Sequence, residues 1–189
     1  MFKAKRRTVV SVAAVAVVLL AAALAVTLLT QGSGKADAGY VFYPESQRHL
    51  VPDFTAPSLT GTSINFASYR GKVVVVNFWG SWCDPCRSEA PTLAGLSDQY
   101  RSRGVSFLGV DVSDTPVNAL AFTRSVGITY PSVNDSGYSV TQDFSQVVPI
   151  SGTPTTIVVD RTGHVAGYIY GGATYSALNT LLGDVAVTR

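Results

Sequence analysis

The stretch KVVVVNFWGSWCDPC, residues 72–86, contains the features that decide the fold. Residues 72–79 form a nearly continuous run of β-branched and aromatic side chains, which is typical of a strand buried on both faces of a sheet. Pro85 suits the first turn of a helix, and residues 86–103 then carry apolar side chains at helical spacing. The stretch therefore predicts a buried strand that leads through two cysteines into a helix.

Strand and helix patterns alternate through the rest of the body in the same way. Strand–helix alternation followed by a hairpin favours an α/β fold with a mixed central sheet and helices on both faces. Residues 40–50 and 129–148 receive no assignment. Patterning and turn residues predict a small hairpin around Gly61, strands over residues 105–112, 155–160 and 164–170, and helices over residues 116–126 and 173–182.

The amino-terminal part of the chain has the pattern of a membrane segment. Residues 1–7 contain four basic side chains, and residues 8–30 carry no charge and are almost all Val, Ala and Leu. A helix of that length spans roughly 30 Å of hydrocarbon, and its basic flank stays in the cytoplasm. We therefore predict a cytoplasmic tip and transmembrane anchor over residues 1–30, a linker over residues 31–50 and an extracytoplasmic domain over residues 51–189.

A cleaved signal peptide is the alternative interpretation of this segment. Ala36-Asp37-Ala38 is a small-x-small triplet, and cleavage near Ala38 would release a secreted protein. The apolar run is longer than the core of about 7–15 residues that signal peptides carry, which favours the uncleaved, single-pass anchor. In both interpretations the domain lies outside the cytoplasmic membrane.

Composition excludes several classes of protein. The chain has 14 Lys and Arg against 12 Asp and Glu, but four of the basic residues lie in residues 1–7, so the body is slightly acidic. A nucleic-acid partner needs a basic patch on the folded part, so none is expected. Two cysteines are too few for a multi-disulfide scaffold or a four-cysteine zinc site, and no metal site is predicted.

The candidate chemistry lies at Cys83 and Cys86. A helix amino terminus carries partial positive charge and unpaired N–H groups, and both stabilise the reactive thiolate. Cys83 would lie at the amino terminus of the helix as the exposed nucleophile, and Cys86, one turn further along the helix, would resolve the mixed disulfide. An inert structural disulfide and half of a metal site are weaker interpretations of the same pair. The redox-active disulfide is thus predicted to serve without any other cofactor.

The residues around this pair resemble a known family. NFWGSWCDPCRSEAP, residues 77–91, looks like the active-site block of thioredoxin-fold proteins of the TlpA/ResA group. Three further blocks fall where that group has its own: FTAPSL at residues 54–59, Gly71-Lys72, and GTPTTIVVD at residues 152–160 followed by a glycine. The resemblance covers about residues 51–189 and implies a thioredoxin-like fold that performs thiol–disulfide exchange.

The resemblance also implies roles for residues outside the cysteine pair. The Thr153–Pro154 bond is expected to be cis, to face the disulfide and to dock the backbone of a partner protein. A carboxylate at the position of Glu89 lies near the cysteines in that group and influences proton transfer, the alternative being a solvated helix residue. Asn77 stands where cytoplasmic thioredoxins have a buried aspartate, and this departure argues against a general thioredoxin role.

Two residues beside the cysteines are candidates for tuning and contact. Asp84 lies between the cysteines, and its negative charge should oppose the formation of a thiolate at Cys83. Trp82 is expected at the surface beside Cys83, where it would give partners an apolar contact. Trp79 is expected in the core.

Three functions compete at this point. The first is a membrane-anchored reductase that receives electrons from a membrane protein and reduces client disulfides. The resemblance implies apocytochrome c as such a client, since its thiols must be reduced before haem attachment. The second is an oxidase or isomerase that forms disulfides in exported proteins with the same two cysteines. The third is a Cu(I)-binding accessory protein or a peroxiredoxin-like antioxidant. The third is disfavoured because the spacing is C-x-x-C, no histidine is suitably placed, and the P-x-x-x-T-x-x-C setting of a peroxidatic cysteine is absent.

Overall fold

The computed structural model describes residues 36–37 and 39–187 of the chain. The membrane segment predicted over residues 8–30 lies outside these described residues. Within the described part, no helix combines the length and the apolar character needed to cross a membrane.

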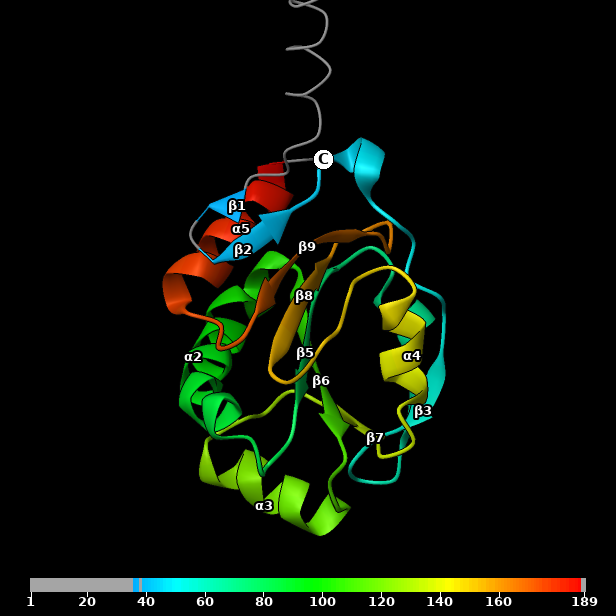
Figure 1. Cartoon of the computed structure of the whole chain (residues 1–189), viewed down its shortest axis with the longest axis vertical. Coiled ribbons are helices and arrows are strands. Elements are labelled where there is room, and N and C mark those ends of the chain that lie inside the picture. The colour runs from blue at the N-terminus through cyan, green and yellow to red at the C-terminus, as the bar shows by residue number, and fades with distance from the viewer. Residues whose placement is uncertain (1–35, 38, 188–189) are drawn as a thin grey trace, which may run out of the picture. The chain divides into compact units, whose positions relative to one another are not determined.

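A mixed sheet forms the centre of the domain, as predicted, and it has seven strands in the described part of the chain (Figure 1). In spatial order the sheet contains β1 (Ala36–Asp37), β2 (Tyr40–Phe42), β9 (Val165–Tyr170), β8 (Thr155–Val159), β5 (Val73–Trp79), β6 (Val105–Val112) and β7 (Ser132–Asp135). The pairs β5–β6 and β6–β7 are parallel, whereas β5–β8, β8–β9, β9–β2 and β2–β1 are antiparallel. A separate hairpin, β3 (Thr55–Pro57) and β4 (Ser63–Asn65), flanks Gly61 as expected.

Helices cover both faces of this sheet (Figure 1). The helices are α2 (Asp84–Tyr100), α3 (Pro116–Ser125), α4 (Ser139–Ser145) and α5 (Tyr175–Val187), with single 3-10 turns η1 (Glu45–Gln47), η2 (Phe66–Tyr69) and η3 (Arg101–Arg103). One buried cluster joins β5 and β9 to helices α2 and α5, and another joins β5 and β6 to α4 and the hairpin on the opposite face.

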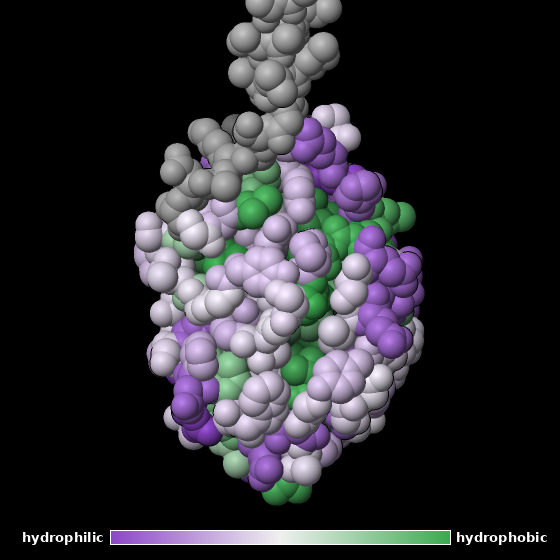
Figure 2. Space-filling view, viewed as in Figure 1, coloured by the Kyte–Doolittle hydropathy of each residue, from purple (hydrophilic) through white to green (hydrophobic). Residues whose placement is uncertain are grey.

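The burial of β5 explains its unbroken apolar sequence. Successive side chains of a strand point to opposite faces, so Val73 and Val75 enter the α2–α5 cluster while Val74 and Val76 enter the α4 cluster. All residues of β5 are buried. On the face of the domain that Figure 2 shows, hydrophobic residues lie between hydrophilic and neutral ones.

Strand β7 and helix α4 fall in the region that received no assignment from sequence. The β7 side chains mix polar and apolar types, and α4 is short, so neither has a clear period. Tertiary contacts supply what the local pattern lacks. The carboxylate of Asp135 accepts hydrogen bonds from the backbone N–H groups of Val140 (3.0 Å) and Thr141 (2.8 Å), which fixes the start of α4.

Residues 40–51 lie along the outer side of β9. Strand β2 pairs with β9, and the Val51 N–H donates to the Gly163 carbonyl at 3.0 Å. The guanidinium of Arg48 binds the Asp160 carboxylate at 3.0 Å, and both side chains are largely buried. The segment that the sequence analysis placed in the linker therefore contributes a strand and an ion pair to the same sheet.

Candidate active site

The cysteine pair lies at the amino terminus of α2, directly after the loop that leaves β5. Cys83 is the N-cap of the helix, and its sulfur accepts a hydrogen bond from the Cys86 N–H at 3.2 Å. Cys83 and Cys86 form a disulfide with a Cα–Cα distance of 5.2 Å. Pro85 occupies the first turn, where its missing N–H leaves no hydrogen bond unmade. The helix start thus presents its positive end to the sulfur that would become the thiolate.

Both cysteines are buried in this oxidised state. Cys83 is 5% exposed and Cys86 is 2% exposed, so the expectation of an exposed Cys83 is wrong for the disulfide form. The reason is packing: both cysteines belong to one buried cluster with Trp79 and Phe122. The indole of Trp79 is in the core, as predicted, with its ring centroid 5.0 Å from that of Phe122.

Trp82 lies at the surface of the same loop, as predicted. Its side chain is 56% exposed, and its indole N–H donates to the Val112 carbonyl at 3.3 Å. The ring lies over Gly80, where an added Cβ would be 2.5 Å from the indole nitrogen. The Ser81 N–H donates to Asp114 at 2.8 Å. The loop is therefore held against the carboxyl end of β6 while Trp82 offers an apolar face to solvent.

The Thr153–Pro154 bond is cis, as the resemblance implied. Strand β8 begins at the next residue, and its register pairs Thr155 with Phe78, the last but one residue of β5. Pro154 consequently lies at the end of the sheet where β5 ends and the cysteine loop begins. Pro154 is buried and Thr153 is partly exposed.

Glu89 lies inside the protein and is hydrogen-bonded there. It is 4% exposed, so the interpretation as a solvated helix residue is wrong. One carboxylate oxygen accepts from the Asn77 side chain at 2.8 Å, and the other accepts from the Ala173 N–H at 2.6 Å. Burial raises the pKa of Glu89 to about 7, although these two hydrogen bonds act in the opposite direction. A carboxyl with this pKa can take up or release a proton near neutral pH.

Asn77 is a site residue whose role sequence reasoning missed. Its amide donates to both Glu89 and the Thr156 hydroxyl, the latter at 3.0 Å, and Asn77 is 3% exposed. The available signal was a polar residue within the otherwise apolar run of β5, because a buried amide needs partners. Asn77 links β5 to α2 and β8, and this link fixes the position of the carboxyl.

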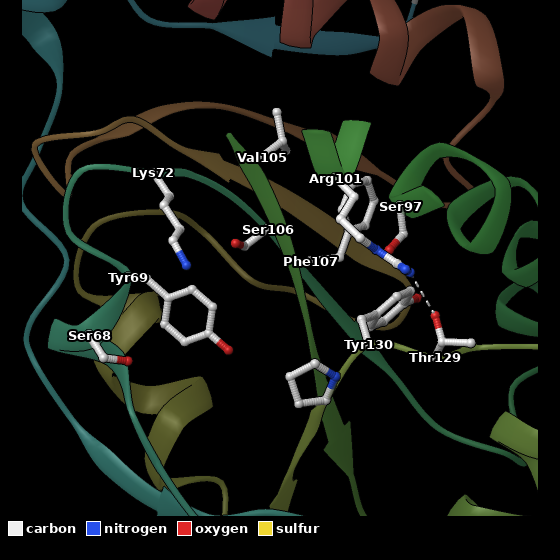
Figure 3. A pocket seen from close by; sticks show the side chains of 11 residues that line it. Ser68, Tyr69, Lys72, Ser97, Arg101, Val105, Ser106, Phe107, Thr129 and Tyr130 are labelled. Carbon is white, nitrogen blue, oxygen red and sulfur yellow. Dashed lines mark hydrogen bonds between the residues drawn. The ribbon is translucent and has the colours of Figure 1, made fainter. Parts of the chain in front are cut away.

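A separate pocket of about 540 Å³ lies at the opposite end of the sheet (Figure 3). Lys72 and Val105, which line it, flank the starts of β5 and β6, whereas the cysteines follow the end of β5. Tyr130 also lines it, and burial, followed by the charge of Glu89, raises the pKa of this phenol. None of the predicted site residues lines this pocket.

Comparison with known proteins gives one consistent family. A profile described as the AhpC/TSA family matches residues 48–168. The chain belongs to the AhpC/TSA family. Within it, the thiol-disulfide oxidoreductase ResA of Geobacillus thermodenitrificans is 37% identical over 121 residues, which cover 64% of this chain and 67% of the relative. ResA of Bacillus subtilis is 30% identical over 68% of this chain and 70% of the relative.

Two solved structures resemble this member of the AhpC/TSA family in fold and sequence. A DsbF homologue from Corynebacterium diphtheriae has a TM-score of 0.72 and 31% identity, covering 80% of this chain and 96% of its own. A secreted thiol-disulfide isomerase from Corynebacterium glutamicum has a TM-score of 0.71 and 31% identity, covering 79% and 92%. These relatives, together with the Cys83–Cys86 pair, establish a thioredoxin-like thiol-disulfide oxidoreductase.

Asp84 occupies the first position of α2 in this oxidoreductase and is exposed. A negative charge at a helix start favours the helix, yet it lies beside the sulfur that must become a thiolate. Its role in tuning Cys83 therefore stays a prediction.

Substitution of Glu89 by glutamine should remove a pH-dependent loss of stability. Burial raises the pKa of Glu89 from 4.5 to about 7, so the native protein keeps a proton that the unfolded chain loses. The contribution of Glu89 to stability is therefore highest below about pH 4.5, falls as the pH rises towards 7 and then levels off, by on the order of 3 kcal/mol in total. Urea unfolding of the oxidised protein between about pH 4 and 8 measures this fall.

The informative quantity is the difference between the wild-type and Glu89→Gln curves, because another buried acid with a raised pKa, Asp111, contributes a fall of the same sign. Glu45→Gln serves as the matched control, since Glu45 is exposed on η1. Parallel curves for wild type and Glu89→Gln would contradict the assignment of this titration to Glu89.

Proposed function

We propose that this oxidoreductase is a membrane-anchored, extracytoplasmic reductase of protein disulfides, with apocytochrome c as its client. The resemblance to ResA-type oxidoreductases over 64% of the chain supports the reaction class. The basic tip and uncharged apolar run of residues 1–30 support the anchor. The observation that carries the proposal is the Cys83–Cys86 disulfide at the start of α2.

The reductive cycle follows from the two cysteines. Cys83, as a thiolate, attacks one sulfur of the client disulfide and forms a mixed disulfide, releasing the other client sulfur as a thiolate that takes up a proton. Cys86 then loses its proton and attacks Cys83, which releases the second client thiol and leaves the protein oxidised. A membrane electron-donor protein restores the dithiol. The disulfide is itself the redox group in this cycle, and no bound cofactor takes part.

Client docking is assigned to the surface around the pair. Trp82 offers an exposed apolar ring next to Cys83, and Thr153 and Pro154 lie at the sheet edge from which the cysteine loop starts. A client segment that lies between these two features would bring its disulfide to Cys83. Glu89, whose pKa is raised to about 7 by burial, serves as the proton-transfer group for the second thiol.

A second candidate function is the formation or isomerisation of disulfides in exported proteins. The similarity to a secreted thiol-disulfide isomerase at 31% identity favours it. The two functions use the same cysteines and differ in the reduction potential of the couple. In the secreted alternative, cleavage near Ala38 would release the domain from the membrane.

The reduction potential separates these two functions. We expect equilibration with dithiothreitol to give a value near that of thioredoxin, about −270 mV, together with reduction of a disulfide-bonded peptide that carries C-x-x-C-H. A potential near about −120 mV, as in strong oxidants, would replace the reductase by the disulfide-forming function. Fractionation of cells that express the full chain tests the anchor, since a mature amino terminus after Ala38 in the soluble fraction would contradict it.

A further inference from the structure

A cluster of buried polar atoms without hydrogen-bond partners lies beneath the cysteine loop. Among the described residues, these atoms include the Trp79 indole nitrogen, both carboxylate oxygens of Asp111, the Ser132 hydroxyl and the Asn134 carbonyl oxygen. The parallel registers pair Trp79 with Asp111 and Asp111 with Asn134. Because paired residues of adjacent strands point to the same face, the three side chains lie in one row across β5, β6 and β7.

Gly109 leaves the space in which this row converges. Gly109 pairs with Ser132 and lies two residues before Asp111 on the same face of β6. A Cβ at Gly109 would collide with the Ser132 hydroxyl and would lie 2.7 Å from the Trp79 indole nitrogen. The donor of Trp79 and the hydroxyl of Ser132 therefore approach each other over Gly109, beside the Asp111 carboxyl.

Asp111 has the strongest need for hydrogen-bond partners in this row, because it is 0% exposed and neither of its carboxylate oxygens has a partner among the described residues. An ionised carboxylate in such a place is costly, whereas the protonated acid is both a donor and an acceptor. The protonated form matches its neighbours: it can accept from the Trp79 N–H and donate to the Asn134 carbonyl.

The charges around Asp111 also favour the protonated form. Burial, followed by the negative charges of Asp114 and Asp135, raises the pKa of Asp111 to about 7. Helix α2 adds the acid Glu89, and its Arg87 is engaged with the Ser81 carbonyl and the Phe122 ring. The buried residues of α3 carry no charge.

The row is connected to the disulfide by packing and by the loop. Trp79 shares a buried cluster with Cys83 and Cys86. The loop that carries the cysteines is hydrogen-bonded to Val112 and Asp114, which closely follow Asp111 on the chain. Packing and loop thus link the cysteines to the Asp111 carboxyl, which forms no ion pair with a described residue.

We propose that Asp111 is a second buried acid of the active site, a positioning residue that acts on the Cys83–Cys86 couple through Trp79 and binds a proton when the disulfide is reduced. In this step a donor dithiol loses two electrons and two protons and becomes a disulfide, and the S–S bond of Cys83–Cys86 accepts the electrons and breaks. At a pH above the pKa that Asp111 has in the disulfide form, its carboxyl is ionised before this step. One proton then binds Cys86, the other binds Asp111, and Cys83 remains a thiolate.

The test is the pH dependence of the reduction potential, measured against dithiothreitol from about pH 5 to 9 in the Glu89→Gln background. One additional linked proton steepens the slope of a two-electron couple by up to about 30 mV per pH unit, which corresponds to a tenfold change in the equilibrium constant. In the Glu89→Gln variant we expect a pH interval in which the reduction potential falls with this steeper slope. The interval should be absent in the double variant Glu89→Gln, Asp111→Asn.

Asp143→Asn, in place of Asp111→Asn, is the matched control. It makes the same chemical change on α4, whose buried side chains pack against the opposite face of the sheet, and the steeper interval should remain. Should the double variant not fold, the Asp111 carboxyl carbon is followed by NMR in the oxidised and reduced wild-type protein. The titration of the Asp111 carboxyl is expected to have its midpoint at a higher pH in the reduced protein than in the oxidised protein. Equal midpoints, or a folded double variant that keeps the steeper interval, would overturn the proposal.

Discussion

Cys83→Ser is expected to reduce catalysed disulfide exchange to the rate of the protein-free reaction. Cys83 is the N-cap of α2, and the Cys86 N–H donates to its sulfur, so it has the environment that stabilises a thiolate. A serine hydroxyl at this position keeps the cap but cannot attack a disulfide. Insulin reduction in the presence of dithiothreitol measures the loss, with circular dichroism as the check that the fold is intact.

Asp98→Asn provides the control for this substitution. Asp98 is exposed on the distal half of α2, where it pairs with Arg101, and exchange should proceed at the wild-type rate. Turnover by Cys83→Ser well above the protein-free rate would show that Cys86 or another group acts as the nucleophile.

Phe144→Ala is expected to lower the free energy of unfolding by about 3–5 kcal/mol. Phe144 is 0% exposed, and its ring contacts three others, with centroid distances of 5.3 Å to Phe78, 5.8 Å to Phe66 and 6.1 Å to Phe54. Removal of the ring leaves a cavity between α4, β5 and the segment around the hairpin. Urea unfolding of the oxidised protein at constant pH measures the change.

Val117→Ala is the matched truncation on the surface. Val117 is 77% exposed on α3, so the change should stay within about 0.5 kcal/mol. A typical single substitution costs about 1 kcal/mol. A loss smaller than this for Phe144→Ala would mean that α4 does not form the packed layer described here.

The central unit of the fold was predictable because its signals are local. The apolar run of β5, Pro85 in the first turn of α2 and the glycine after η3 specify a strand, a helix start and a helix end without reference to the rest of the chain. Strand β7 and helix α4 escaped prediction because their order depends on distant contacts. The Leu59 N–H, for example, donates to the Ser132 carbonyl at 2.9 Å across the edge of β7.

The candidate site was predictable only in part, for the same reason. The cysteine spacing identified Cys83 and Cys86, but the surroundings of Glu89 come from Asn77 on β5 and Ala173 before α5. Asn77 and Asp111 share a signal that sequence reasoning can use, namely a polar residue within a buried parallel strand. Each such residue must find a partner in the interior, but which partner depends on register and helix packing.

The most direct test of the central claim, that exchange proceeds through Cys83, is to trap its intermediate. Reduced Cys86→Ser is mixed with a disulfide-bonded C-x-x-C-H peptide, quenched with acid and analysed by mass spectrometry. The expected product is a stable mixed disulfide on Cys83, because the resolving sulfur is absent. No adduct on folded Cys86→Ser, or an adduct that forms equally fast on Cys86 in Cys83→Ser, would contradict the account.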